Sequence, residues 1–178
     1  MFVRYKYPKR LDEVRQSIAD FIHADIDEVV LVSNATAGLN AVLRNLRFST
    51  GDLILYVQGT YGAIEKTVHY LVETTPAESV CVHFDPTIDN DDELLETFQS
   101  VLEAYQGRIR VAIFDTVMSM PGLRMPFERL TKACEKFQAL SVIDGAHGIG
   151  LIDLDLEQLN ADFLVTNCHK YVVQSHLF

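Results

Sequence analysis

The residues of greatest chemical interest are Asp144 and Lys170, because each follows a short apolar run rich in Val, Ile or Leu. The second run ends in DFLVTNCHKYV, where an amine follows an asparagine, a cysteine and a histidine. If the two runs are neighbouring strands about 5 Å apart, both side chains open onto one crevice. A partly desolvated lysine near other cations favours the neutral amine, which is a nucleophile that forms an imine with an aldehyde.

Pyridoxal phosphate (PLP) is the common biological aldehyde that proteins hold in this way. Its ring nitrogen needs a carboxylate partner to stay protonated, so that the ring can act as an electron sink. Asp144 is placed to be that carboxylate. The pair therefore predicts a PLP site in which Lys170 anchors the cofactor and later moves the α-proton of an amino-acid substrate.

Polar residues after the other apolar runs fit the same ligand. SNATAG opens a helix whose first N–H groups suit a phosphate, and Thr36 adds a hydroxyl. Tyr61, in a glycine-flanked turn, can lay its ring on a flat heterocycle. We expect His147 and Ser119 to donate hydrogen bonds to the phenolic oxygen of the ring, and Asn167 to reach the phosphate or brace the imine.

Each of these residues also has a simpler interpretation. Lys170 can be a solvated strand end, and Asp144 can be a turn residue, since Asp-Gly is ordinary turn chemistry. A polar helix start such as NATAG occurs in any βα unit. His147 can be a buried imidazole with its hydrogen bonds satisfied, and Cys168 a small buried filler. The order of a phosphate site, an aromatic ring, an acid and a lysine at successive run ends favours the cofactor site.

The elements that would position these residues alternate along the chain. Near-continuous apolar runs are typical of strands covered on both faces, and amphipathic stretches between them predict helices. This βαβα order predicts an α/β fold with a mostly parallel sheet and helices on both faces. The expected strands are 28–33, 53–58, 79–84, 109–115, 140–144 and 162–166, and the expected helices are 11–23, 36–48, 61–73, 91–105 and 127–138.

Composition limits the class of protein. The 178 residues, 48% of them hydrophobic, suffice for one domain with a substantial core, and no linker divides residues 1–178. A formal charge of −10 disfavours nucleic acids and membrane surfaces as partners. Three sparsely spaced cysteines predict neither a disulfide framework nor a metal site. We therefore expect a protein of the reducing cytoplasm, with no export or membrane segment.

Three stretches resemble a known family: VSNATAGLNAVL, DTVMSMPGLRMPFERL and VIDGAHGIGLIDLDLEQLNADFLVTNCHKY. They are similar to the class V aminotransferases among the fold type I PLP enzymes, near the isopenicillin-N-epimerase-like and cysteine-desulfurase-like branch. The resemblance implies an amino-acid substrate and a homodimer for the full-length enzyme. It also implies that Lys170 is the Schiff-base lysine, Asp144 partners the pyridine nitrogen, His147 contacts the phenolic oxygen, Tyr61 stacks on the ring, and Ala35, Thr36 and Asn167 belong to the phosphate region.

The sequence departs from the family after Lys170. The family continues with a loop containing Gly, Pro and Arg and then with a small C-terminal domain, whereas this chain reads YVVQSHLF. Residues 1–178 are therefore expected to be a truncated PLP-binding large domain without the arginine that clamps the substrate carboxylate. The resemblance favours a carbon–sulfur lyase or desulfurase; the alternatives are an epimerase, an aminotransferase or a catalytically inactive fragment.

Overall fold

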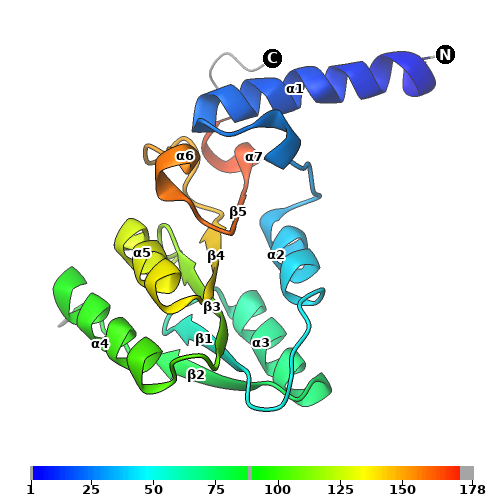
Figure 1. Ribbon diagram of the computed structural model, residues 1–178. Coiled ribbons are helices and arrows are strands. Elements are labelled where there is room, and N and C mark those ends of the chain that lie inside the picture. The colour runs from blue at the N-terminus through cyan, green and yellow to red at the C-terminus, as the bar shows by residue number, and fades with distance from the viewer. Residues whose placement is uncertain (1, 88–89, 173–178) are drawn as a thin grey trace.

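The computed structural model describes residues 2–87 and 90–172 and contains a five-stranded sheet (Figure 1). All four strand pairings are parallel, and the order across the sheet is β2-β1-β3-β4-β5. This confirms the α/β class and five of the six expected strands. The strands are β1 (Leu53–Val57), β2 (Glu78–Val82), β3 (Ile109–Asp115), β4 (Leu140–Gly145) and β5 (Phe163–Thr166).

Helices cover both faces of the sheet, as Figure 1 shows with α4 and α5 on one side and α2 and α3 on the other. Their apolar side chains form two clusters separated by the strands, as expected for a parallel sheet buried on both faces. The five expected helices are present, and α6 and α7 are short additions. The helices are α1 (Tyr7–Ile22), α2 (Ala35–Leu43), α3 (Gly62–Thr74), α4 (Asp91–Ala104), α5 (Phe127–Phe137), α6 (Leu156–Leu159) and α7 (Cys168–Tyr171).

Alternation along the strands assigns side chains to the two faces. Ile113 of β3 and Val142 of β4 belong to the cluster under α2 and α3. Phe114 and Ile143, one residue further on, belong to the cluster under α4 and α5. Asp115 lies two residues after Ile113, and Asp144 lies two residues after Val142. Their side chains are therefore on the α2–α3 face as well.

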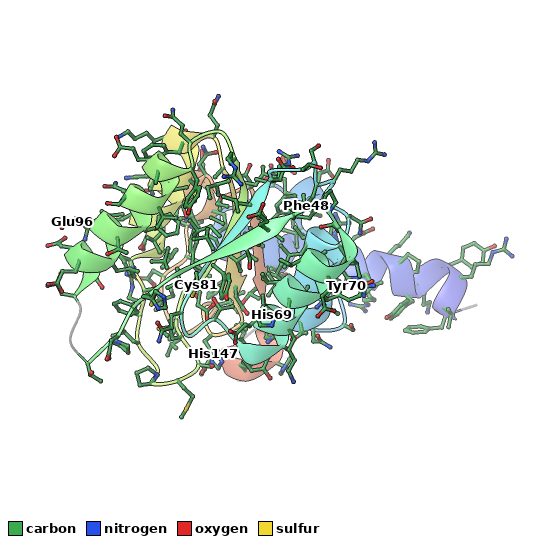
Figure 2. All side chains as sticks on the ribbon, turned by 90° about the horizontal axis from the view of Figure 1, so that it is seen from below. Phe48, His69, Tyr70, Cys81, Glu96 and His147 are labelled. Atoms are coloured by element: carbon green, nitrogen blue, oxygen red, sulfur yellow. The ribbon has the colours of Figure 1, made fainter. Side chains whose placement is uncertain are left out.

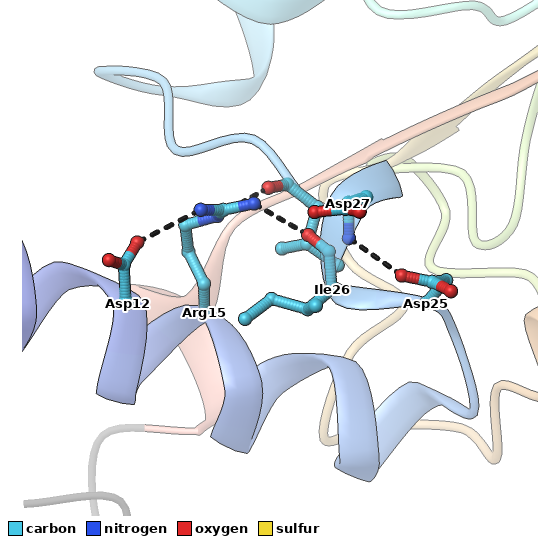
Figure 3. Close-up of polar contacts among 6 residues, drawn as sticks. Asp12, Arg15, Asp25, Ile26 and Asp27 are labelled. Carbon is cyan, nitrogen blue, oxygen red and sulfur yellow. Dashed lines mark hydrogen bonds and ion pairs between the residues drawn. The ribbon is translucent and has the colours of Figure 1, made fainter.

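The expected first strand, 28–33, is wrong. Ile26–Glu28 form a short 3-10 helix, and residues 29–34 run on without strand pairing to any described residue. Arg15 of α1 donates hydrogen bonds to the carbonyl oxygens of Ile26 at 2.6 Å and Val29 at 2.8 Å (Figure 3). The Val30 side chain is 75% exposed. An apolar run becomes a strand only when a neighbour accepts its backbone hydrogen bonds, and the described residues provide none here.

The N-terminal part of the chain projects beyond the sheet. Residues Phe2–Lys6 form a π-helical turn that leads into α1, and Figure 1 shows this end reaching past the other elements. The other end of α1 is attached to the body, because the His23 carbonyl accepts a hydrogen bond from the Glu157 amide at 3.1 Å. No helix among residues 2–87 and 90–172 has the length and apolarity needed to cross a membrane.

Candidate functional site

Two carboxyl groups stand level at the carboxyl ends of the central strands. Asp115 ends β3 and is paired in register with Asp144 of β4, so both side chains point to the α2–α3 face. Their side chains are almost fully buried, with Asp115 5% and Asp144 4% exposed. Buried charges usually have partners, so the environment of each carboxylate matters.

Asp144 has groups around it that favour its charged form. Its Oδ1 accepts a hydrogen bond from the Ala146 amide at 2.9 Å. Burial raises the pKa of Asp144, while this hydrogen bond and the nearby Lys170 and His147 oppose the rise. Asp144 is therefore the carboxylate that a positive partner can best stabilise.

Asp115 has no such support. Its Oδ1 is buried and has no hydrogen-bond partner among the residues that the structure describes. Burial, together with the charge of Asp144, raises the pKa of Asp115 to about 8. Asp115 is therefore mainly a neutral acid at pH 7.

Lys170, His147 and Tyr171 form a hydrogen-bonded chain beside the two aspartates. Nζ of Lys170 lies 3.0 Å from Nε2 of His147, and Nδ1 of His147 lies 2.9 Å from Oη of Tyr171. Figure 2 labels His147 next to the ribbon of α7, which carries both of its partners. The loop after β4 and the short helix after β5 thus meet at one imidazole.

The imidazole of His147 is placed to accept a hydrogen bond from the lysine. Burial and the charge of Lys170 lower the pKa of His147, and Asp144 only partly opposes them. A neutral ring that accepts from Lys170 at Nε2 carries its hydrogen on Nδ1 and donates it to Tyr171. The reverse tautomer accepts from Tyr171 and donates to a neutral Lys170, so the ring can pass a proton between them.

Asn167 joins the end of β5 to the start of α2. Its Oδ1 accepts a hydrogen bond from the Ala35 amide at 2.9 Å, and both residues are buried. Asn34 caps α2 by accepting from the Ala37 amide at 2.8 Å. Two of the first amides of α2 are thus bonded to asparagine side chains, and Thr36, which lies between them in the sequence, is half-buried.

Close backbone approaches bring the remaining strand ends together. A Cβ on Gly38 of α2 would lie 2.6 Å from Cγ1 of Val165, so α2 packs directly on β5. Gly59, in the turn before Tyr61, has a φ of +89°, and a Cβ there would lie 2.1 Å from Cε of Met118. The loops that carry Tyr61 and Ser119 are therefore neighbours, although neither side chain hydrogen-bonds to the Lys170 chain within the described structure.

The structure thus brings together three of the predicted site residues, Asp144, His147 and Lys170, and separately joins Asn167 to Ala35. It differs from expectation at Lys170, which is exposed on the helical turn Cys168–Tyr171. The described strand stops at Thr166 because Asn167 turns its side chain to α2.

Two residues of the site were missed from the sequence, Asp115 and Tyr171. Asp115 carried a usable signal, since it ends an apolar run just as Asp144 nearly does. Tyr171 follows Lys170 directly, and no spacing rule indicates that its hydroxyl reaches His147.

Other features of the described chain lie away from this cluster. Two surface hollows of about 260 and 310 Å³ are lined by residues at the opposite, amino ends of the strands, including Leu140 and Ile109. Within residues 2–87 and 90–172, no three His, Cys, Asp or Glu side chains are arranged to hold a metal. The candidate site is the cluster at the carboxyl ends of the strands, which is where open α/β sheets bind their ligands.

Comparisons with known proteins identify the family of this chain. The family model described as aminotransferase class-V matches residues 4–173. The L-cysteine desulfhydrase-like protein lolT1 of Epichloe uncinata is 35% identical over 176 residues, which are 97% of this chain and 38% of that protein. The hercynylcysteine sulfoxide lyase of Schizosaccharomyces pombe is 32% identical over 93% of this chain and 41% of its own length.

Solved structures show the same fold. The apo cysteine desulfurase of Thermococcus onnurineus has a TM-score of 0.82 at 24% identity, covering 91% of this chain and 39% of that one. The cystine C-S lyase C-DES, solved with its product cysteine persulfide, has a TM-score of 0.82 at 20% identity over 92% of this chain and 43% of its own. The chain thus spans about two fifths of the proteins it matches.

Proposed function

Since this chain belongs to the class-V aminotransferase family, we propose that it forms the PLP-binding part of an enzyme that breaks a carbon–sulfur bond in a cysteine-like amino acid. The observation that carries this proposal is the cluster of Lys170, His147 and Asp144 at the carboxyl ends of β4 and β5. An amine that can form an imine and a buried carboxylate for the ring nitrogen are the groups that a pyridine aldehyde requires.

The residues present fit PLP. Lys170 is the amine to which the aldehyde carbon would attach, and Asp144 is the buried carboxylate suited to a protonated ring nitrogen. Thr36 and the amide end of α2 suit the phosphate, with Asn167 and Ala35 fixing that end of the helix. Tyr61, Ser119 and His147 remain proposed contacts of the ring and its phenolic oxygen.

PLP supplies an electron sink that stabilises negative charge at the substrate α-carbon. The chain itself supplies proton handling. With Lys170 Nζ 3.0 Å from His147 and Tyr171 Oη 2.9 Å from the other ring nitrogen, a proton taken by the lysine has a route through the imidazole. Lys170 is thus proposed to move the α-proton, and His147 to set its protonation state.

The choice of carbon–sulfur chemistry rests on relatives. Two curated relatives above 30% identity are named as a cysteine desulfhydrase-like protein and a sulfoxide lyase of a cysteine derivative. The isopenicillin N epimerase of Streptomyces clavuligerus is more distant, at 27% identity. Epimerisation and transamination are therefore the outcomes against which lyase activity is to be measured.

We also propose that activity needs residues beyond this chain. The matched relatives are more than twice its length. In the full-length enzyme we expect a small C-terminal domain and a homodimer. A cytoplasmic location accords with three free cysteines, Cys81, Cys134 and Cys168.

Cofactor attachment is the first test. The chain is incubated with PLP, reduced with borohydride, digested and mapped by mass spectrometry. We expect the adduct on Lys170, its loss in Lys170→Ala, and its retention in Lys132→Ala, which removes an exposed lysine of α5. An adduct on another lysine with Lys170 unmodified contradicts the assignment.

Reaction type is the second test. The full-length enzyme is assayed with L-cysteine and S-substituted cysteines for release of sulfur products, keto acid and ammonia. Release of sulfur products by the wild type, and its loss in Lys170→Ala, support lyase activity. Racemised substrate without sulfur release identifies an epimerase, and amino-group transfer to a keto acid identifies an aminotransferase.

A further inference from the structure

The feature of this site that the proposed function leaves unused is Asp115. It lies level with Asp144 on the adjacent strand, and both side chains are on the same face of the sheet. Adjacent strands are about 5 Å apart, so the two carboxyl groups face each other across a small gap. Asp115 is 5% exposed, and its Oδ1 has no hydrogen-bond partner among the described residues.

Two such carboxyl groups do not both ionise. Water is largely excluded, so repulsion between two negative charges at this separation is weakly screened. The single charge goes to the carboxyl with better support. Asp144 has the Ala146 amide at 2.9 Å and lies near Lys170 and His147. For Asp115, the charge that raises its pKa is that of Asp144, and no basic side chain of the described residues lowers it.

We propose that Asp115 is a positioning residue of the cofactor site that holds the one proton of the aspartate pair and thereby leaves Asp144 as its sole carboxylate. This inference rests on the proposed PLP function. Asp115 acts through Asp144, because a neutral neighbour lets Asp144 stay ionised in a buried setting. The protonated Asp115 at the end of β3 thus keeps Asp144 of β4 negatively charged opposite a pyridine nitrogen.

The orphan oxygen also explains why a carboxylic acid rather than a carboxylate is tolerated there. A buried anion without a donor is far more costly than a buried neutral acid with one unmade hydrogen bond. An asparagine has nearly the same shape and no charge. Asp115→Asn is therefore expected to preserve the site, whereas a purely anionic role would be abolished by the same change.

The proton is located without the cofactor. The full chain is labelled at the aspartate side-chain carboxyl carbons and its resonances are followed by NMR as pH is raised, with Asp115→Asn identifying the signal. We expect Asp115 to titrate near pH 8 and Asp144→Asn to shift that midpoint to lower pH, because a like charge is removed. Infrared detection of a protonated carboxyl at pH 7 in the wild-type chain, with loss of that band in Asp115→Asn, gives the same answer by a second method.

The link to the cofactor site is tested by absorbance. The absorbance of the visible band of PLP bound to the wild-type chain is followed against pH. We expect this absorbance to change in a step at the titration midpoint of Asp115, and we expect the step to be absent in Asp115→Asn. Asp153→Asn, an exposed loop aspartate, is the control and should keep the step. A merely structural Asp115 would change stability without moving this spectral step.

The outcomes separate the two proposals. If Asp115 titrates at the ordinary acidic pH of an exposed aspartate, or if the spectral step persists unchanged in Asp115→Asn, the inference is overturned. If PLP leaves no adduct on Lys170, the proposed function fails, while the carboxyl titration still reports whether Asp115 holds the proton.

Discussion

Asp144 and Asp115 are the same residue type at the same level of neighbouring strands, yet their surroundings differ, and we propose that this difference gives them different protonation states. One accepts the Ala146 amide and lies near two basic side chains, and the other has a buried oxygen with no partner in the described structure. Environment rather than residue type therefore divides the roles, as in other paired carboxyl sites.

Asp144→Asn is predicted to retain cofactor attachment at Lys170 and to lose activity. An amide has no charge with which to keep a pyridine nitrogen protonated. We expect the turnover of the full-length enzyme to fall on the order of 100-fold or more, a size typical of removing a preorganised electrostatic partner. The measurement is steady-state turnover beside borohydride trapping. Unchanged turnover with the adduct intact would show that Asp144 has another role.

The stability of the chain is predicted to fall as pH rises through the neutral range. Asp115 has a pKa of about 8 when folded, against an ordinary value of 3.8, so between these values the folded state holds a proton that the unfolded state has released. The free energy of unfolding then decreases with pH, by up to about 1.4 kcal/mol per pH unit for one proton.

Urea unfolding between pH 5 and about 9 measures this slope. The amide introduced in Asp115→Asn cannot titrate, so this variant should reduce the slope of the free energy of unfolding against pH by the contribution of one proton. Above the titration midpoint of Asp115, the variant should be more stable than the wild type. Equal slopes for the two proteins would show that Asp115 is ionised throughout this range.

Single site residues could be predicted from the sequence only where they lie just after a predicted strand. Asp144, His147 and Lys170 were identifiable because each follows an apolar run, and the structure joins them. The Tyr171 hydroxyl could not be identified as part of the site, because its contact with His147 depends on the local turn after Asn167. Oδ1 of Asp115 has no hydrogen-bond donor among the described residues, and no sequence pattern predicts the absence of such a donor.

At the level of elements, the site depends on the junction between β5 and α2. Asn167→Ala leaves the buried Ala35 amide without its acceptor at 2.9 Å. We predict a loss of about 1–3 kcal/mol in the free energy of unfolding, the usual cost of a buried unsatisfied amide. Asn45→Ala, which removes an exposed side-chain bond just after the same helix, should cost less than about 0.5 kcal/mol. Equal losses in the two variants would contradict this view of the junction.

A second junction ties the segment after α1 back to α1 itself. Arg15 donates to the carbonyls of Ile26 and Val29, and its side chain is largely covered (Figure 3). Arg15→Met is predicted to cost about 1–3 kcal/mol and to speed proteolysis within residues 26–33. Arg10→Met breaks only an exposed ion pair with Glu13 and should be nearly neutral. Proteolysis at the wild-type rate in Arg15→Met would show that these hydrogen bonds do not hold the segment.

These elements show where periodicity is a good guide. The strand runs ending at Asp115 and Asp144 were predicted to within two residues, because each is buried between two helical layers. The run ending at Thr166 was predicted as closely, although its strand lies half-exposed at the edge of the sheet. The run 28–33 has the same composition and is no strand in the described structure. Composition predicts that a run is apolar and extended, whereas pairing depends on a neighbour elsewhere in the chain.

The whole molecule has an apolar side that the described residues do not cover. β5 is an edge strand with Phe163 39% exposed, and Val30, Leu31 and Val32 are 75%, 42% and 47% exposed. At the opposite edge, β2 begins with the exposed charge of Glu78. An unpaired edge with apolar side chains favours pairing with another strand, whereas charges oppose it.

The 178-residue chain alone is therefore predicted to self-associate as its concentration rises. Apolar surface at Val30 and Leu31 should be buried by a second copy when nothing else covers it, and the free edge of β5 offers hydrogen-bonding groups to the same end. Size-exclusion chromatography with light scattering measures the mass. Val30→Lys combined with Leu31→Lys should shift the protein towards monomer, because each substitution places a charge where burial would be needed.

The control is Met120→Lys, which changes a side chain that is 80% exposed in the loop after β3. It adds the same kind of charge, so any general effect of solubility appears in it as well. Association that persists in the double variant, or that weakens equally in the control, would place the contact elsewhere. A wild-type chain that stays monomeric across the concentration range would show that the exposed 30–32 segment and the β5 edge are not sufficient to pair two copies.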